Sequence, residues 1–205
     1  VLSWPATPAR YLVVAALAFA LALLVAGGAF AHGVAGKDAA FVAANEGAQI
    51  IPFLYLGAKH MVTGYDHLLF ILGVIFFLYR LSHVAIYVTL FSIGHSITLL
   101  TGVLNNIDVN PYLVDAVIGL SVVYKAFDNL GGFKTMFGFQ PGTRTAVLAF
   151  GLVHGFGLAT KLQALNMSSD GLVANMVSFN VGVELGQLLV VAVAVPVKFL
   201  FPMYL

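Results

Sequence analysis

The chain has 205 residues, of which 61% are hydrophobic and only 8% are charged, with a formal net charge of +1 and no cysteine. A water-soluble domain carries about 25% charged residues, so this chain lacks the polar surface that a soluble fold needs. The absence of cysteine excludes disulfides and thiolate metal sites, and the few Lys and Arg residues exclude a nucleic-acid groove. The composition therefore predicts an all-α, polytopic bundle of transmembrane helices surrounded by the lipid bilayer.

Residues 1–31 have the features of a secretory signal peptide. Arg10 precedes an apolar run at 11–25, and Ala29-Phe30-Ala31 forms a cleavage site with small residues at both ends. Cleavage would leave His32 at the N-terminus, where its amine and ring nitrogen can bind a metal ion together. The simpler interpretation is that His32 is only the first residue after the cleavage site. The alternative for the whole segment is an uncleaved anchor helix.

A periplasmic segment at 32–48 follows, and a transmembrane domain takes up 49–205. Its hydropathy predicts five spans, at about 65–81, 84–104, 111–130, 144–163 and 172–200. A shorter apolar element at 49–62 is either a re-entrant or interfacial helix, or the first part of one long helix broken near Gly64. Because the chain ends directly after a span, we expect a further C-terminal helix beyond it.

Two pairs of glycines in the last two spans are spaced for close helix packing. Gly151-x-x-x-Gly155 and Gly182-x-x-x-Gly186 each place small residues on one face, which would let these helices approach closely.

The positive residues are divided between the two ends of the spans. Arg80, Lys134, Arg144 and Lys198 fall at one set of ends, whereas Lys37, Lys59 and Lys161 fall at the other, among several acidic residues. The positive-inside rule places the first set in the cytoplasm. This agrees with export of the mature N-terminus to the periplasm and predicts a multi-pass protein of the bacterial inner membrane.

A few ionisable residues fall inside these apolar spans. Such groups are costly in hydrocarbon, so each is a candidate for function. They are His60, Asp66 and His67 around the first span, His95 in the second, Asp115 in the third, His154 in the fourth and Glu184 in the fifth. Imidazoles with a carboxylate suit Zn²⁺, Ni²⁺ or Co²⁺. The alternative is a hydrogen-bonded network that holds the helices together.

Other polar residues would support this site. Asn180, Glu184 and Gln187 are spaced four and three apart, so they share a helix face that must point into the protein. Ser96 lies next to His95 and offers a hydroxyl. By position along the spans, His95, His154 and Glu184 fall near the bilayer centre, and Asp66, His67 and Asp115 fall nearer the outer surface. The series predicts a path from the periplasm to the middle of the membrane.

The remaining polar and aromatic residues have simpler interpretations. Lys125, Asp128 and Asn129 fall near the inner end of the third span and are expected at the membrane interface. The Phe- and Gly-rich stretch at 131–142 is expected to be a loop, and the many Phe residues to face lipid or fill the core.

Four motifs in this order resemble the HupE/UreJ family, in its branch with Asp-His-Leu-Leu-Phe and Phe-Asn-x-Gly-Val-Glu. They are His60-x5-Asp66-His67-Leu68-Leu69-Phe70, Gly94-His95-Ser96-Ile97-Thr98-Leu99, Phe150-Gly151-Leu152-Val153-His154-Gly155-Phe156-Gly157 and Phe179-Asn180-Val181-Gly182-Val183-Glu184-Leu185-Gly186-Gln187. The resemblance implies a nickel or cobalt permease or accessory protein, of the kind encoded near hydrogenase and urease genes. By motif position it implies metal ligation by His60, Asp66, His67, His95, His154 and Glu184, with Asp115 where a Glu is expected.

Three functions are compatible with these residues. The first is a permease or metal-binding accessory protein for a divalent ion of Ni, Co or Zn, or alternatively Cu. The second is an intramembrane metal-dependent hydrolase with a metal-bound water. The third is a structural subunit that associates with another membrane protein or with copies of itself. The resemblance favours the first, and so favours a protein that is not an enzyme.

Overall fold

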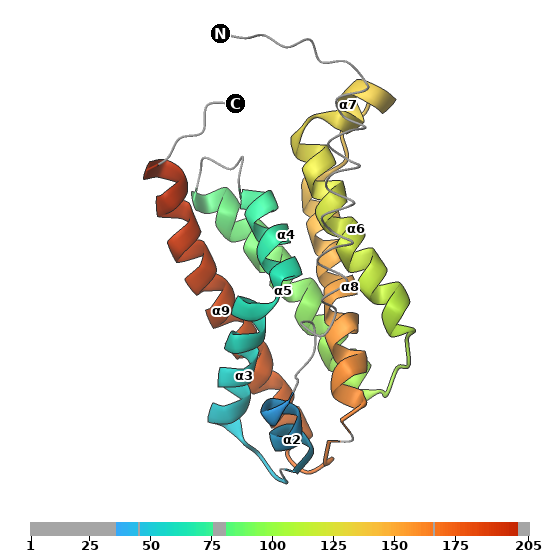
Figure 1. Ribbon diagram of the computed structural model, residues 1–205, viewed down its shortest axis with the longest axis vertical. Helices are drawn as coiled ribbons and strands as arrows, with labels where there is room; N and C mark the ends of the chain where they lie inside the picture. Colours follow the sequence, from blue (N-terminus) through green and yellow to red (C-terminus); the bar gives the residue numbers. More distant parts are fainter. Residues whose placement is uncertain (1–35, 45, 76–80, 166, 201–205) are drawn as a thin grey trace.

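The computed structural model describes residues 36–44, 46–75, 81–165 and 167–200, so the predicted signal segment and His32 lie outside the described residues. Within these ranges every regular element is a helix, which confirms the all-α prediction (Figure 1). The helices are α2 (Lys37–Ala44), α3 (Ile50–Thr63), α4 (Tyr65–Ile75), α5 (Leu81–Leu104), α6 (Pro111–Asn129), α7 (Gly132–Phe137), α8 (Thr143–Gln163) and α9 (Leu172–Leu200).

Three of the helices, over Ser82–Leu104, Thr143–Gln163 and Leu172–Val195, are long and apolar enough to cross a membrane. They coincide with three of the five predicted spans. α4 is apolar but has only 11 residues, and the 19 residues of α6 include Asp115, Lys125 and Asp128. The spans predicted at these two helices therefore stay predictions.

The apolar element predicted at 49–62 and the start of the first predicted span meet at a helix break at Gly64. α3 ends at Thr63, because the ψ of 96° at Gly64 leaves the helical range, and α4 begins at the next residue. The Gly64 N–H still donates to the carbonyl of His60 at 2.9 Å, so the two helices meet without a loop. Figure 1 shows α4 following α3 end to end, with α3 alongside α9. The broken-helix alternative is therefore the one that the structure adopts.

The bundle contains two closely packed parallel pairs, α5 with α8 and α3 with α9. At the contact between α5 and α8, a Cβ added to Gly155 would collide with the carbonyl oxygen of His95. At the contact between α3 and α9, a Cβ added to Gly182 would collide with the carbonyl oxygen of Leu54. Both predicted glycine pairs thus allow close approach, but their partners are α5 and α3 rather than each other.

Side-chain hydrogen bonds tie these pairs to each other and to α6. Gln187 of α9 accepts from the Ser92 hydroxyl at 2.8 Å and donates to the carbonyl of Val88 at 2.9 Å, which fixes α9 against α5. Asn129 at the end of α6 donates to the carbonyl of Gly73 in α4 at 2.7 Å. The last bond fixes the short α4 against α6, and α4 also packs against α5 and α9.

Candidate metal centre

Five of the predicted site residues converge in the core of the bundle, from four different helices. Each is at most 6% exposed, and His95 is fully buried. We call this group the His/Asp cluster; its members are His60 from α3, Asp66 and His67 from α4, His95 from α5 and His154 from α8.

His67 lies at the centre of the cluster. Its ring centroid is 4.8 Å from that of His154, 5.0 Å from that of His60 and 5.7 Å from that of His95. The break at Gly64 makes this possible, because it brings the last turn of α3 and the first turn of α4 to the same point.

The ends of the two short helices also suit a charged site. Asp66 occupies the first turn of α4 and His60 the last turn of α3. A helix N-terminus stabilises a negative side chain and a C-terminus stabilises a cation, since unpaired amides or carbonyls are exposed there. The backbone around Gly64 therefore suits an acidic side chain at Asp66 and a basic one at His60.

His154 presents a defined nitrogen to Asp66. Its Nδ1 lies 2.7 Å from the carbonyl oxygen of Phe150, which can only accept, so Nδ1 carries the proton. In the neutral ring the lone pair is then on Nε2, which lies 3.8 Å from Oδ2 of Asp66. The same carboxylate oxygen is 3.3 Å from Nδ1 of His67.

The cluster also holds imidazole nitrogens that the described residues do not satisfy. Nε2 of His67 and both ring nitrogens of His95 are buried and have no hydrogen-bond partner in the described part of the chain. A buried polar atom without a partner costs about 1–3 kcal/mol, and several in one place indicate a site for a ligand.

Aromatic rings surround these polar groups. Phe91 lies 5.1 Å from His154 and 5.9 Å from His67, Phe70 lies 5.7 Å from His154, and Phe179 lies 5.9 Å from His60, all between ring centroids. All three phenylalanines are at most 1% exposed. An apolar shell keeps water out and so strengthens any electrostatic interaction inside it.

The order of depths in the membrane that the sequence predicted is wrong for the residues of the cluster. Asp66 and His67 were expected nearer the outer surface than His95 and His154, yet all four meet in one group. The reason is that α3, over Ile50–Thr63, directly precedes α4, so the first turn of α4 lies in the middle of the bundle rather than at one end. The residues form one site rather than successive positions along a path.

The other predicted residues lie outside the cluster. Both carboxylate oxygens of Asp115 accept from Lys161 of α8, at 3.0 and 3.2 Å, which makes a separate, partly exposed ion pair. Gln187 is fully buried but bonds to α5, and Ser96 is only half-buried.

Asn180 and Glu184 on α9 are also half-buried. Asn180 donates to the carbonyl of Met176 at 3.0 Å, in its own helix. Glu184 has no hydrogen bond or ion pair with the residues that the structure describes. The assignment of Glu184 as a metal ligand therefore stays a prediction.

Some polar residues have a role that the sequence alone did not suggest. Ser92, which is 7% exposed, pairs with Gln187, and only the fold brings these two distant residues together. Lys125 and Asp128 were expected at the interface but are buried and form an ion pair at 2.6 Å, which Gln140 extends by donating to the same carboxylate. The spacing of three along α6 was the available signal for this pair.

The cluster can offer several nitrogen and oxygen donors to one cation. Asp66, His67 and His154 each present a ligand atom, and these three atoms lie within 4.8 Å of one another. Donors on one tetrahedral ion lie about 3.4 Å apart, given metal–ligand bonds of about 2.0–2.1 Å. Small side-chain shifts would therefore bring the three atoms to ligation distances.

Comparison with known proteins gives one match. The family model for the HupE / UreJ protein matches residues 36–203, which cover all the helices that the structure describes. No curated protein and no solved structure matches the chain. Since the match spans most of the sequence and the described part is an apolar helical bundle with a buried His/Asp group, the protein belongs to the HupE/UreJ family, whose members are membrane proteins that handle metals such as nickel and cobalt.

Proposed function

We propose that this protein is a permease or metal-binding accessory protein of the inner membrane that holds a divalent transition-metal ion in the His/Asp cluster. The donors are imidazole nitrogens and one carboxylate, without thiolates. Such a set suits nickel and cobalt, and also zinc or copper, better than magnesium or calcium, which prefer oxygen.

The contact between His154 and Asp66 carries the proposal. The Nδ1–H of His154 is directed to the Phe150 carbonyl, so Nε2 faces the carboxylate with its lone pair when the ring is neutral. Two lone-pair donors repel unless a proton or a metal cation lies between them. His67, beside the same carboxylate oxygen, supplies a third donor, and His60 or His95 can complete a four-coordinate site.

The charges at the two ends support an orientation with the α7 end in the cytoplasm. Lys134 and Arg144 at that end are exposed and form no ion pair with described residues. At the other end Lys59 is paired with Asp38 and Lys161 with Asp115, and Lys37 is exposed. By their place in the sequence, four Lys and Arg residues fall at the α7 end and three at the other. The positive-inside rule counts these residues, and it supports a periplasmic location for α2 and for the predicted mature N-terminus.

Metal binding to the purified protein tests the proposal. The protein is loaded with Ni²⁺, Co²⁺ or Zn²⁺, and its affinity is measured by competition with a chelator. We expect Asp66→Asn to lower the affinity by roughly 10- to 100-fold or more, because the uncharged amide is a poor ligand. Asp115→Asn is the matched control, since it makes the same change in a carboxylate outside the cluster, and it should bind as the parent does.

The outcomes separate the three functions. Bound metal that also crosses into proteoliposomes supports the permease, and bound metal without flux leaves the accessory protein or the hydrolase. If the parent binds none of these ions, or if both variants bind like the parent, the cluster only holds helices together and the proposal is wrong.

A further inference from the structure

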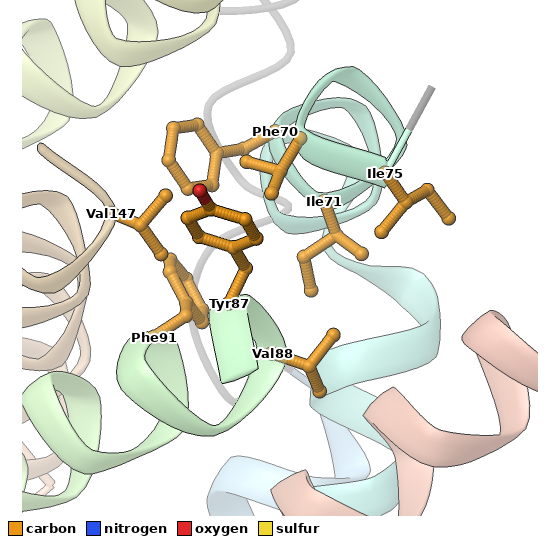
Figure 2. Close-up of a pocket in the computed structure, with 8 residues that line it drawn as sticks. Phe70, Ile71, Ile75, Tyr87, Val88, Phe91 and Val147 are labelled. Atoms are coloured by element: carbon orange, nitrogen blue, oxygen red, sulfur yellow. The ribbon is translucent and has the colours of Figure 1, made fainter. Parts of the chain in front are cut away.

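Figure 2 shows a small apolar pocket in the bundle. It lies beside the His/Asp cluster, because two of its lining residues, Phe70 and Phe91, also contact His154. The side chains that line it come from α4, α5 and α8, and the Tyr87 hydroxyl is the only polar group among them; they are Phe70, Ile71, Val74, Ile75, Tyr87, Val88, Phe91 and Val147. These residues belong to the C-terminal part of α4, the N-terminal part of α5 and the start of α8. The pocket therefore lies on the α7 side of the cluster, which is the side proposed to face the cytoplasm.

Two phenylalanines belong to both the pocket and the wall of the cluster. Phe70 and Phe91 line the pocket, and their ring centroids are 5.4 Å apart. On the opposite side both rings contact His154, and Phe91 also stacks on His95 with centroids 6.3 Å apart. Both rings are 1% exposed, line the pocket and contact the cluster, so they form the wall that the pocket and the cluster share.

We propose that Phe70 and Phe91 form an inner seal, which closes the metal site towards the cytoplasm and must separate before an ion can leave in that direction. This inference rests on the proposed function. A layer of aromatic rings excludes the water that a divalent ion carries, and hydrophobic constrictions of this kind close ion pathways in membrane proteins. The ion is then held by the cluster and is not open to the inner side.

The break at Gly64 provides a way to open the seal. Phe70 is on α4 and Phe91 is on α5, so the seal is made by two helices that can move relative to each other. A tilt of α4 about Gly64 would carry Phe70 away from Phe91. Asp66 and His67 lie next to the break and would move least, so the ligands would stay together while the seal opens.

Cysteine accessibility tests the seal without any metal, because the natural chain has no cysteine. Single variants Tyr87→Cys, at a half-buried position that lines the pocket, and His95→Cys, behind the seal, are treated in inside-out vesicles with a charged, impermeant thiol reagent. We expect the Tyr87→Cys protein to react from this side and the His95→Cys protein to be protected. Adding Phe70→Ala to His95→Cys should raise its reaction rate about tenfold or more, because the barrier is removed.

The matched control is Phe53→Ala in the same His95→Cys background. Phe53 is a buried phenylalanine of α3, 2% exposed, that does not line the pocket. Rapid reaction of the His95→Cys protein with Phe70 intact would overturn the seal. An unchanged reaction rate after Phe70→Ala would also overturn the seal. So would an equal increase in rate with Phe53→Ala, because it would show that loss of any buried phenylalanine loosens the whole bundle.

Metal release gives the second measurement and separates this inference from the proposed function. In loaded parent protein, Phe91→Leu should speed release about tenfold while the equilibrium affinity stays within about threefold, because the Phe91 ring forms part of the barrier to release but donates no ligand atom. Normal binding with unchanged release contradicts the seal alone. A parent that binds no metal contradicts the proposed function, and the accessibility result then decides whether the rings close the cluster.

Discussion

Single hydrogen bonds set the chemistry of this site, because each ring nitrogen in the apolar core has few partners. His154 directs Nδ1 to the carbonyl four residues earlier in α8, which leaves Nε2 for Asp66. Fixing one nitrogen by a carbonyl is how proteins orient histidine ligands. The sequence shows that a histidine is present at this position, but only the backbone contact determines which nitrogen faces the cluster.

Substitution of Gln187 tests how much a buried hydrogen bond between helices contributes to stability. Gln187→Leu removes its bonds to Ser92 and to the Val88 carbonyl, and it leaves the buried Ser92 hydroxyl without its acceptor. We expect a loss of about 1 kcal/mol in the free energy of unfolding, as for other interhelical hydrogen bonds in membranes. Unfolding in denaturant or by heat in detergent gives the measurement.

The double variant Ser92→Ala/Gln187→Leu provides the comparison. Because both partners are then apolar, its stability should be closer to that of the parent than the stability of Gln187→Leu alone. Equal losses of stability in the single and double variants would show that the hydrogen bond between Ser92 and Gln187 contributes little to the free energy of unfolding. Metal affinity should stay unchanged in both, since neither residue belongs to the cluster.

At the scale of helices, the site depends on two features of backbone geometry. The break at Gly64 brings His60 next to His67, and the close approach of α8 to α5 brings His154 and His95 towards them. Gly155 is central to the second feature, because it directly follows His154 and lies against the backbone of His95. Helix packing and the metal centre are therefore coupled.

Gly155→Ala tests this coupling. The added methyl group would collide with the His95 carbonyl and with Thr98 of α5, so the two helices must move apart. We expect a loss of about 1–3 kcal/mol in stability, as for other overpacked cores, and weaker metal binding.

The matched control for this substitution is Gly119→Ala in α6. Nothing lies within 4 Å of a Cβ at Gly119, so alanine should be neutral or slightly stabilising there. Unchanged stability and affinity in Gly155→Ala would show that the separation of α5 and α8 does not control the cluster.

At the scale of the whole molecule, the bundle has two chemically different ends with the His/Asp cluster between them. Lys59 and Lys161 at the α2 end are paired with acids. Lys37 at that end is exposed, as are Lys134 and Arg144 at the α7 end. The proposed orientation follows from the positive-inside rule, because four Lys and Arg residues fall at the α7 end by sequence and three at the α2 end. It also determines the direction in which the inner seal would open.

Labelling from each side of the membrane tests the orientation. Ile107→Cys lies between α5 and α6 at the α2 end, and Met136→Cys lies in α7; the native side chains are 38% and 41% exposed. In intact cells with a permeable outer membrane, an impermeant thiol reagent should label the Ile107→Cys protein. The Met136→Cys protein should react only after the inner membrane is opened, and the opposite pattern would reverse the proposed orientation. The natural, cysteine-free chain is the control.

The sequence by itself determined the class of protein, the positions of the long helices and the identity of the polar residues in the core. These properties are local: apolar runs predict α5, α8 and α9 within a few residues, and an ionisable side chain in such a run stands out because hydrocarbon penalises it. The family could also be identified, because its motifs are contiguous in the chain.

Only the tertiary structure decided which of these residues share a site. Asp115 and Glu184 have the same chemical character as Asp66, yet Asp115 pairs with Lys161 and Glu184 is half-buried on α9. Asp66 reaches the cluster because the helix breaks at Gly64 and two parallel helix pairs pack closely through glycines. Such placement depends on contacts between segments far apart in the chain, and the same contacts decide that Phe70 and Phe91 separate the cluster from the apolar pocket.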